Sequence, residues 1–153
     1  MKSFLLNSDK TPILKWSRVP DGIFFEGPLP DGYSLAVAPH QPYIILDVDR
    51  HGGVDGFENI PENIKVELEQ SYSYPTKNNG VHYWLLYTGD KTLINKSSGL
   101  GVDLRIGANK ETGNAGGFVV YYEAQKGKDI RDHTHLIKET SKELNMFLES
   151  LFA

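Results

Sequence analysis

The fold of this 153-residue chain is organised around the stretch Pro42–Gly53, with the sequence PYIILDVDRHGG. The run Tyr43–Leu46 is continuously apolar, which is typical of a buried central strand. Residues two apart on a strand point to the same face, so Asp47 and Asp49 are predicted to present two carboxylates side by side. Such carboxylates repel each other, and a bound magnesium, manganese or calcium ion is the simplest way to keep both ionised. The alternative interpretation is a polar strand end that runs into a Gly-Gly turn.

The composition predicts a single globular domain over residues 1–153. With 39% hydrophobic and 24% charged residues, the chain can bury a real core. The sequence has no cysteine, which excludes disulfides, thiolate zinc sites and cysteine nucleophiles and fits a cytoplasmic protein. A net charge of -4 argues against a strongly basic nucleic-acid binder. No apolar run reaches the length of a signal peptide or a membrane span, so no membrane association is expected.

Apolar and turn-forming residues alternate along the chain in a way that predicts an α+β fold. Strands are expected over residues 4–6, 33–38, 43–49, 81–87, 100–106 and 117–123. Residues 54–70 are expected to be helical, with a short helix over 62–70, and a second helix is expected over 136–152, where apolar residues recur at helical spacing. The Pro39–Pro42 connection predicts that strands 33–38 and 43–49 are adjacent and antiparallel. The result is a mainly antiparallel sheet with the C-terminal helix docked on it.

Two later strands also carry polar residues among apolar neighbours. His82 lies within the strand VHYWLLY and follows Lys77, and Asp103 and Arg105 lie two apart in LGVDLRI. Buried polar groups are costly unless they have partners, so these side chains are expected to meet near the central strand. The alternative is a set of ordinary charges on the solvent face of the sheet, together with a structural histidine.

Three carboxylates and three cationic side chains form a set suited to phosphoryl transfer. Asp47, Asp49 and Asp103 are predicted to hold two divalent ions, which clamp the attacking and leaving oxygens of such a reaction. The groups expected to neutralise the phosphates of a bound nucleotide are His82, Lys77 and Arg105.

The motifs LDVDRHGG, YPTKNNGVHYW, GVDLRI and GGFVVY occur in this order between residues 40 and 122. In this order they resemble the bifunctional DNA primase/polymerase domain of the archaeo-eukaryotic primase superfamily, which is common in phages and plasmids. That family carries an Asp-x-Asp element, a Gly-x-His element on the next core strand and a single Asp after a hydrophobic residue. Here these elements fall on Asp47 and Asp49, on Gly80 and His82, and on Asp103.

The resemblance implies an RRM-like sheet and a template-directed nucleotidyltransferase of phage or plasmid replication. It implies that the three aspartates bind two Mg²⁺ or Mn²⁺ ions and that His82 contacts the incoming triphosphate, helped by Lys77 or Arg105. Nucleoside triphosphates would be the substrates, single-stranded DNA the template and a replicative helicase a partner, in the cytoplasm of the host. The region before Asp47 is shorter than in the family, so a reduced form of the domain is expected.

Two other functions are consistent with the same residues. A non-catalytic module would bind a nucleotide or single-stranded DNA, or dock on a replication partner, without turnover. A small metal-dependent nuclease would use the same aspartates to shorten strands. The basic run Lys126, Lys128 and Arg131 is open to two interpretations, contact with a phosphate backbone or a solvated linker.

Overall fold

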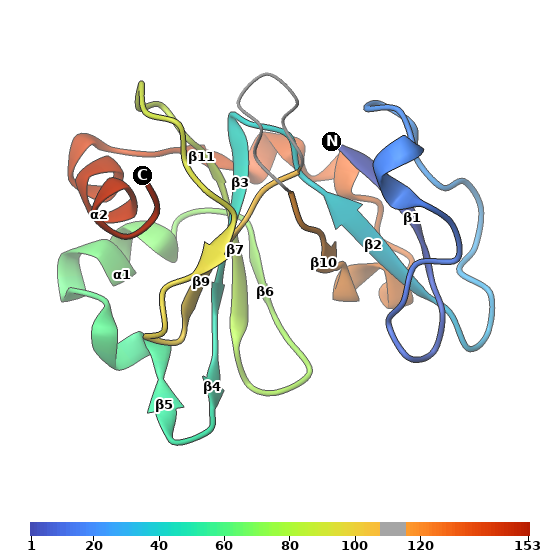
Figure 1. Ribbon diagram of the computed structural model, residues 1–153, viewed down its shortest axis with the longest axis horizontal. Coiled ribbons are helices and arrows are strands. Elements are labelled where there is room, and N and C mark those ends of the chain that lie inside the picture. The colour runs from blue at the N-terminus through green and yellow to red at the C-terminus, as the bar shows by residue number, and fades with distance from the viewer. Residues whose placement is uncertain (108–115) are drawn as a thin grey trace.

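The computed structural model describes residues 1–107 and 116–153, which form three layers (Figure 1). Helices α1 (Glu62–Leu68) and α2 (Lys142–Phe152) lie together on one side of the larger sheet. A smaller sheet covers part of the opposite face. Of the helices in the described ranges, none combines the length and the apolar character that crossing a bilayer requires.

The larger sheet is built around β3 (Tyr43–Val48), which pairs with β7 (Val81–Leu86) on one side and β9 (Val102–Arg105) on the other. Its remaining strands are β6 (Ser73–Pro75), β8 (Lys96–Ser97) and β11 (Lys138–Glu139). Every pair is antiparallel except β11 with β7, which is parallel. The prediction of an α+β fold with a mainly antiparallel sheet and a C-terminal helix packed on it is confirmed.

Alternation along β3 divides the core into two clusters. Ile44, Leu46 and Val48 are fully buried against the helix layer. Ile45 points the other way, into a cluster that includes Val37 of the smaller sheet. Asp47 follows Ile45 at the period-two spacing of a strand, so its carboxylate lies on the face turned toward the smaller sheet.

The smaller sheet has the order β1 (Lys2–Leu6), β2 (Ser34–Ala38) and β10 (Val119–Val120). The prediction that strands 33–38 and 43–49 are adjacent is therefore wrong, because β2 pairs with β1 and β10 and belongs to a different sheet from β3. The intervening connection uses its carbonyls elsewhere: Pro39 accepts from Gly107 N–H and Pro42 from Tyr87 N–H. Those two bonds tie the connection to segments of the larger sheet's side of the molecule, while its own turn is closed by Tyr43 N–H donating to His40 O (2.8 Å).

Three other boundaries differ from the sequence prediction. Helix α2 begins at Lys142, not near residue 136, because Ser141 caps it through a hydrogen bond from Leu144 N–H to Oγ (3.2 Å) and the preceding Lys138–Glu139 extends along β7. The strand expected over 117–123 is limited to β10 and is followed by a 3₁₀ turn, Tyr122–Lys126. The expected helix does not begin at residue 54, because β5 (Val54–Asp55) pairs with β4 (Arg50–His51) in a hairpin and a 3₁₀ turn, Gly56–Asn59, precedes the short α1.

Candidate metal centre

Four polar side chains lie in one row across the larger sheet. Asp47 on β3 is directly opposite His82 on β7 and directly opposite Asp103 on β9, and His82 is in turn opposite Tyr74 on β6. Directly opposite residues on antiparallel strands have Cβ atoms roughly 4.5–5.5 Å apart and share a face. The register therefore brings together side chains that are up to 56 residues apart in the sequence, from Asp47 to Asp103.

Asp49 joins this row from the chain that leaves β3. Its backbone is fixed on both sides: its N–H donates to Gly101 O (2.8 Å) and its carbonyl accepts from Gly56 N–H (2.8 Å). One carboxylate oxygen from each of Asp47, Asp49 and Asp103 can be chosen so that the three oxygens all lie within 4.8 Å of one another. We call these three residues the carboxylate triad. Oxygen ligands lie about 2.0–2.6 Å from Mg²⁺ or Ca²⁺, so atoms at this separation can share an ion.

The triad is largely shielded from water. The exposed fractions of the side chains are 16% for Asp47, 21% for Asp49 and 13% for Asp103. Burial raises the pKa of Asp49 above its ordinary value, and the charges of Asp47 and Asp103 raise it further. Neighbouring His51 and His82 act in the opposite direction but do not cancel the rise. The negative charge of Asp49 is thus not fully stabilised by its protein neighbours.

Of the cations around the triad in the described residues, Arg105 donates a hydrogen bond to Asp103, whereas His82 and His51 lie at ion-pair distances without a hydrogen bond to Asp47 or Asp49. Arg105 contacts Asp103 at 3.2 Å, whereas His82 Nε2 is 3.4 Å from Asp47 Oδ1 and His51 Nε2 is 3.7 Å from Asp49 Oδ2. Within the described part of the chain, Asp47 Oδ1 is buried and has no hydrogen-bond donor. Leaving a buried charged oxygen without a donor is costly, and a metal ion is one kind of partner that satisfies such an oxygen. An all-oxygen donor set of this kind fits Mg²⁺ or Mn²⁺.

His82 is oriented from behind by two buried aromatic residues. Trp84 Nε1 donates to the hydroxyl of Tyr74 (3.0 Å), and that hydroxyl lies 3.2 Å from Nδ1 of His82. An indole N–H can only donate, so the Tyr74 oxygen accepts from Trp84 and turns its own proton toward His82 Nδ1. Burial raises the pKa of Tyr74 well above its ordinary value, which keeps this donor protonated. The neutral imidazole therefore carries its proton on Nε2, which lies 3.4 Å from Asp47 Oδ1 without forming a hydrogen bond to it.

Gly80 allows the β6–β7 loop to approach the triad. A Cβ on this residue would lie 2.5 Å from Val48 O, 2.9 Å from Thr76 Oγ1 and 3.3 Å from Asp49 Oδ1. Its N–H donates to Thr76 Oγ1 (3.1 Å), which closes the loop. Any side chain here would push the loop away from β3, so the glycine two residues before His82 has a steric role in the site.

The structure brings together four of the predicted site residues, Asp47, Asp49, His82 and Asp103, and places the other two at the margin. Arg105 is paired with Asp103 and shares its face of β9. Lys77 is exposed on the β6–β7 loop and lines a neighbouring pocket, outside the row itself.

Sequence reasoning missed Tyr74 and Tyr122. Tyr74 belongs to a three-residue strand, and its only sequence signal is that it lies eight residues before His82 in a segment that can fold back as a hairpin. Tyr122 lies with its ring centroid 6.0 Å from that of His82. Burial raises the pKa of the Tyr122 hydroxyl, and the charges of Asp47 and Asp49 add to the rise.

Comparison with models of known protein families finds no match to this sequence, and a search of curated proteins finds none either. Function is therefore inferred from the geometry of the row and from the order of the motifs along the chain.

Proposed function

We propose that this chain is a metal-dependent nucleotidyltransferase of the primase/polymerase type. The observation that carries the proposal is the alignment of Asp47, Asp103 and His82 in one cross-strand row, with Asp49 beside it. The buried Asp47 oxygen, which has no donor among the described residues, supports a metal ion in this place. The order of the Asp-x-Asp, Gly-x-His and single-Asp elements supports the reaction type.

The aspartates of the triad would hold two Mg²⁺ or Mn²⁺ ions. When bound, such ions neutralise phosphate charge and hold the attacking and leaving oxygens in line. His82 would donate its Nε2–H to a phosphate oxygen of the incoming nucleotide, since Tyr74 fixes the other nitrogen. Arg105 would hold the Asp103 carboxylate in place, and burial of the row would strengthen each of these interactions.

The motif order also supports the rest of the proposal. The substrates would be nucleoside triphosphates and the template single-stranded DNA. Replication of a phage or plasmid would be the setting, with a replicative helicase as partner in the host cytoplasm.

The direct test is a strand-synthesis assay with Mn²⁺, nucleoside triphosphates and labelled single-stranded DNA, with and without a primer. The parent protein is compared with Asp47→Asn and Asp103→Asn, and with Asp129→Asn as a matched change outside the row. Strands that lengthen with the parent and Asp129→Asn, but not with the two row variants, support the proposal. Circular dichroism confirms that each variant is folded.

Other outcomes contradict the proposal in distinct ways. Shortened strands would indicate a nuclease that uses the same aspartates. Binding of nucleotide or DNA without any product would indicate a non-catalytic module. Synthesis by Asp47→Asn at the parent rate would show that the triad is not the catalytic centre.

A further inference from the structure

A pocket beside the carboxylate triad has several lysines among its lining residues. It has a volume of about 440 Å³, and its walls include Lys10, Thr76, Lys77, Tyr122, Glu123 and Lys126. Three separate segments contribute these lysines: the loop after β1, the β6–β7 loop and the 3₁₀ turn Tyr122–Lys126. We call this the lysine pocket. Convergence of like charges from three segments is unfavourable in the absence of an anion.

The lysine pocket has an excess of positive charge. Its lining includes one carboxylate, Glu123, which is buried and already contacts Lys126 (3.2 Å) and Lys128 (3.5 Å). Lys10 donates a hydrogen bond to the hydroxyl of Ser34 (2.7 Å). Because this hydroxyl is neutral, the contact does not neutralise the charge of Lys10. Lys77 is exposed at the tip of its loop. In a chain with a net charge of -4, this local excess is the opposite of the average surface.

Tyr122 connects the lysine pocket to the triad. Tyr122 lines the pocket, and its ring centroid is 6.0 Å from that of His82, the residue directly opposite Asp47 in the sheet. Thr76, on the pocket wall, accepts from Gly80, which is itself packed against Asp49. A molecule that reaches from the triad past Tyr122 therefore enters a positively charged pocket.

We propose that the lysine pocket binds a phosphate group of the molecule whose metal ions the triad holds. This inference rests on the proposed function and names the part of the substrate that the triad does not contact. Phosphate oxygens are strong acceptors, and lysine ammonium groups bind them as point charges without a fixed geometry. The phosphate belongs either to the polyphosphate of a free nucleotide or to the backbone of a bound strand.

The test separates these sources in the absence of metal. Isothermal titration calorimetry in EDTA measures the binding of inorganic triphosphate and, separately, of oligothymidylate. The Lys77→Gln/Lys126→Gln double variant is compared with Lys91→Gln/Lys142→Gln, which removes the same charge from exposed positions outside the pocket. We expect the pocket variant to bind at least about tenfold more weakly and the control to bind like the parent. Thermal unfolding verifies that both variants are folded.

The two arms lead to different conclusions. Weakened binding of triphosphate alone assigns the pocket to a nucleotide polyphosphate. Weakened binding of oligothymidylate assigns the pocket to a strand backbone. In that case the slope of log K against log salt concentration should become shallower by about 0.7 for each lost phosphate contact. Absence of binding in both arms, or equal effects of the two double variants, overturns the proposal.

The proposed function fails independently of this inference. Asp47→Asn should lose Mn²⁺ binding but retain the metal-free binding of phosphate, because no residue of the triad lines the lysine pocket. If the parent binds phosphate through these lysines but binds no Mn²⁺, the nucleotidyltransferase proposal is wrong and the phosphate pocket stands. If Mn²⁺ binds at the triad and the lysine substitutions do not change phosphate binding, the lysine-pocket proposal is wrong and the metal site of the proposed function stands.

Discussion

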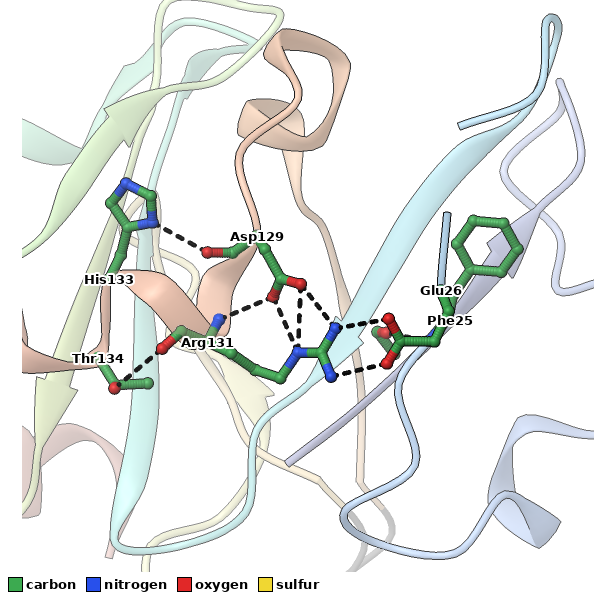
Figure 2. Close-up of polar contacts among 7 residues, drawn as sticks. Phe25, Glu26, Asp129, Arg131, His133 and Thr134 are labelled. Atoms are coloured by element: carbon green, nitrogen blue, oxygen red, sulfur yellow. Dashed lines mark hydrogen bonds and ion pairs between the residues drawn. The ribbon is translucent and has the colours of Figure 1, made fainter. Parts of the chain in front are cut away.

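Two charged clusters in this molecule use the same kinds of side chain in opposite ways. In the first, the carboxylate triad, Asp49 and Asp103 lie beside a buried oxygen of Asp47 that has no hydrogen-bond donor in the described structure. In the second, Arg131 lies between Asp129 and Glu26 and donates to both oxygens of each carboxylate, at 2.6–3.2 Å (Figure 2). We call the second the Arg131 cluster. Its guanidinium also lies over the ring of Phe24.

The pKa values of the acidic groups move in opposite directions in the two clusters. Hydrogen bonds from Arg131 hold the pKa values of Glu26 and Asp129 below their ordinary range. Burial and like charges raise the pKa of Asp49. A cluster whose charges satisfy one another is a structural contact, whereas one that remains unsatisfied in the folded chain is a candidate ligand site. The predictions below compare the two clusters in order of decreasing effect.

The largest expected effect is stabilisation by manganese through the triad alone. At about 100 times its dissociation constant, a ligand stabilises the folded state by about 2.7 kcal/mol, or roughly 5–10 °C in a chain of this size. Thermal unfolding should show this shift for the parent and for Asp129→Asn, and no shift for Asp47→Asn. Equal shifts in all three proteins would place the metal outside the triad.

The second effect concerns the orientation of two histidines. His82 Nδ1 faces the Tyr74 hydroxyl, whereas His133 Nδ1 faces the backbone oxygen of Asp129 (2.9 Å), which can only accept. Nitrogen NMR of the neutral rings should therefore show the proton on Nε2 in His82 and on Nδ1 in His133. The substitution Tyr74→Phe should abolish the preference in His82 and lower stability by about 2 kcal/mol, because it leaves buried polar groups without partners.

Tyr72→Phe is the matched control for that substitution. Tyr72 also loses a buried hydroxyl contact, to the hydroxyl of Tyr121 (2.7 Å), but it has no hydrogen bond to His82 in the described structure. It should lower the melting temperature and leave the His82 tautomer unchanged. If both variants alter the His82 spectrum equally, Tyr74 does not set the tautomer.

The third effect is a gain of stability from removing a charge. In EDTA at neutral pH, Asp49→Asn should raise the stability of the protein by on the order of 1 kcal/mol, after allowance for its partial exposure to solvent. Asp129→Asn should lower stability, because it removes the partner of Arg131. Thermal unfolding measures both, and a loss of stability in Asp49→Asn would show that the triad is satisfied as it stands.

The same raised pKa predicts a dependence on pH. Because the folded state holds the Asp49 proton more tightly than the unfolded chain, the metal-free protein loses this contribution as pH rises from the ordinary value of 3.8 through the raised pKa. Manganese competes with that proton, so its affinity should rise over the same interval. Calorimetric titration of the parent at several pH values tests this, and a pH-independent affinity there would contradict it.

The smallest effect is expected at the exposed cluster. Arg131→Gln should lower the melting temperature by less than Asp49→Asn raises it, since exposed ion pairs contribute little to stability. The loss of melting temperature in Arg131→Gln should become smaller still at about 1 M salt, where the screening length is about 3 Å. A large, salt-independent loss would show that this cluster anchors the fold.

Much of the fold and of the triad could be predicted from the sequence, because β3, β7 and β9 are apolar runs with period-two polar exceptions. What escaped prediction depends on contacts between distant segments. The apolar residue Ile137 continues the helical spacing of α2, yet it packs on the face of the larger sheet opposite that helix. Tyr74 could not be found because a three-residue strand has no periodicity of its own, and Tyr122 because its position depends on a 3₁₀ turn.

One edge of β7 is shared between two strands that run in opposite directions. The antiparallel β6 covers its first half and places Tyr74 beside His82, and the parallel β11 covers Leu85 and Leu86. Removal of residues 138–153 would uncover the second half of this strand edge and would also strip α2, with its buried Leu144, Leu148 and Phe152, from the helix-covered face of the sheet. Bare strand edges and uncovered apolar faces associate with other chains, so such a truncation should produce a protein that self-associates. The C-terminal segment thus protects the sheet against aggregation, in addition to packing the core.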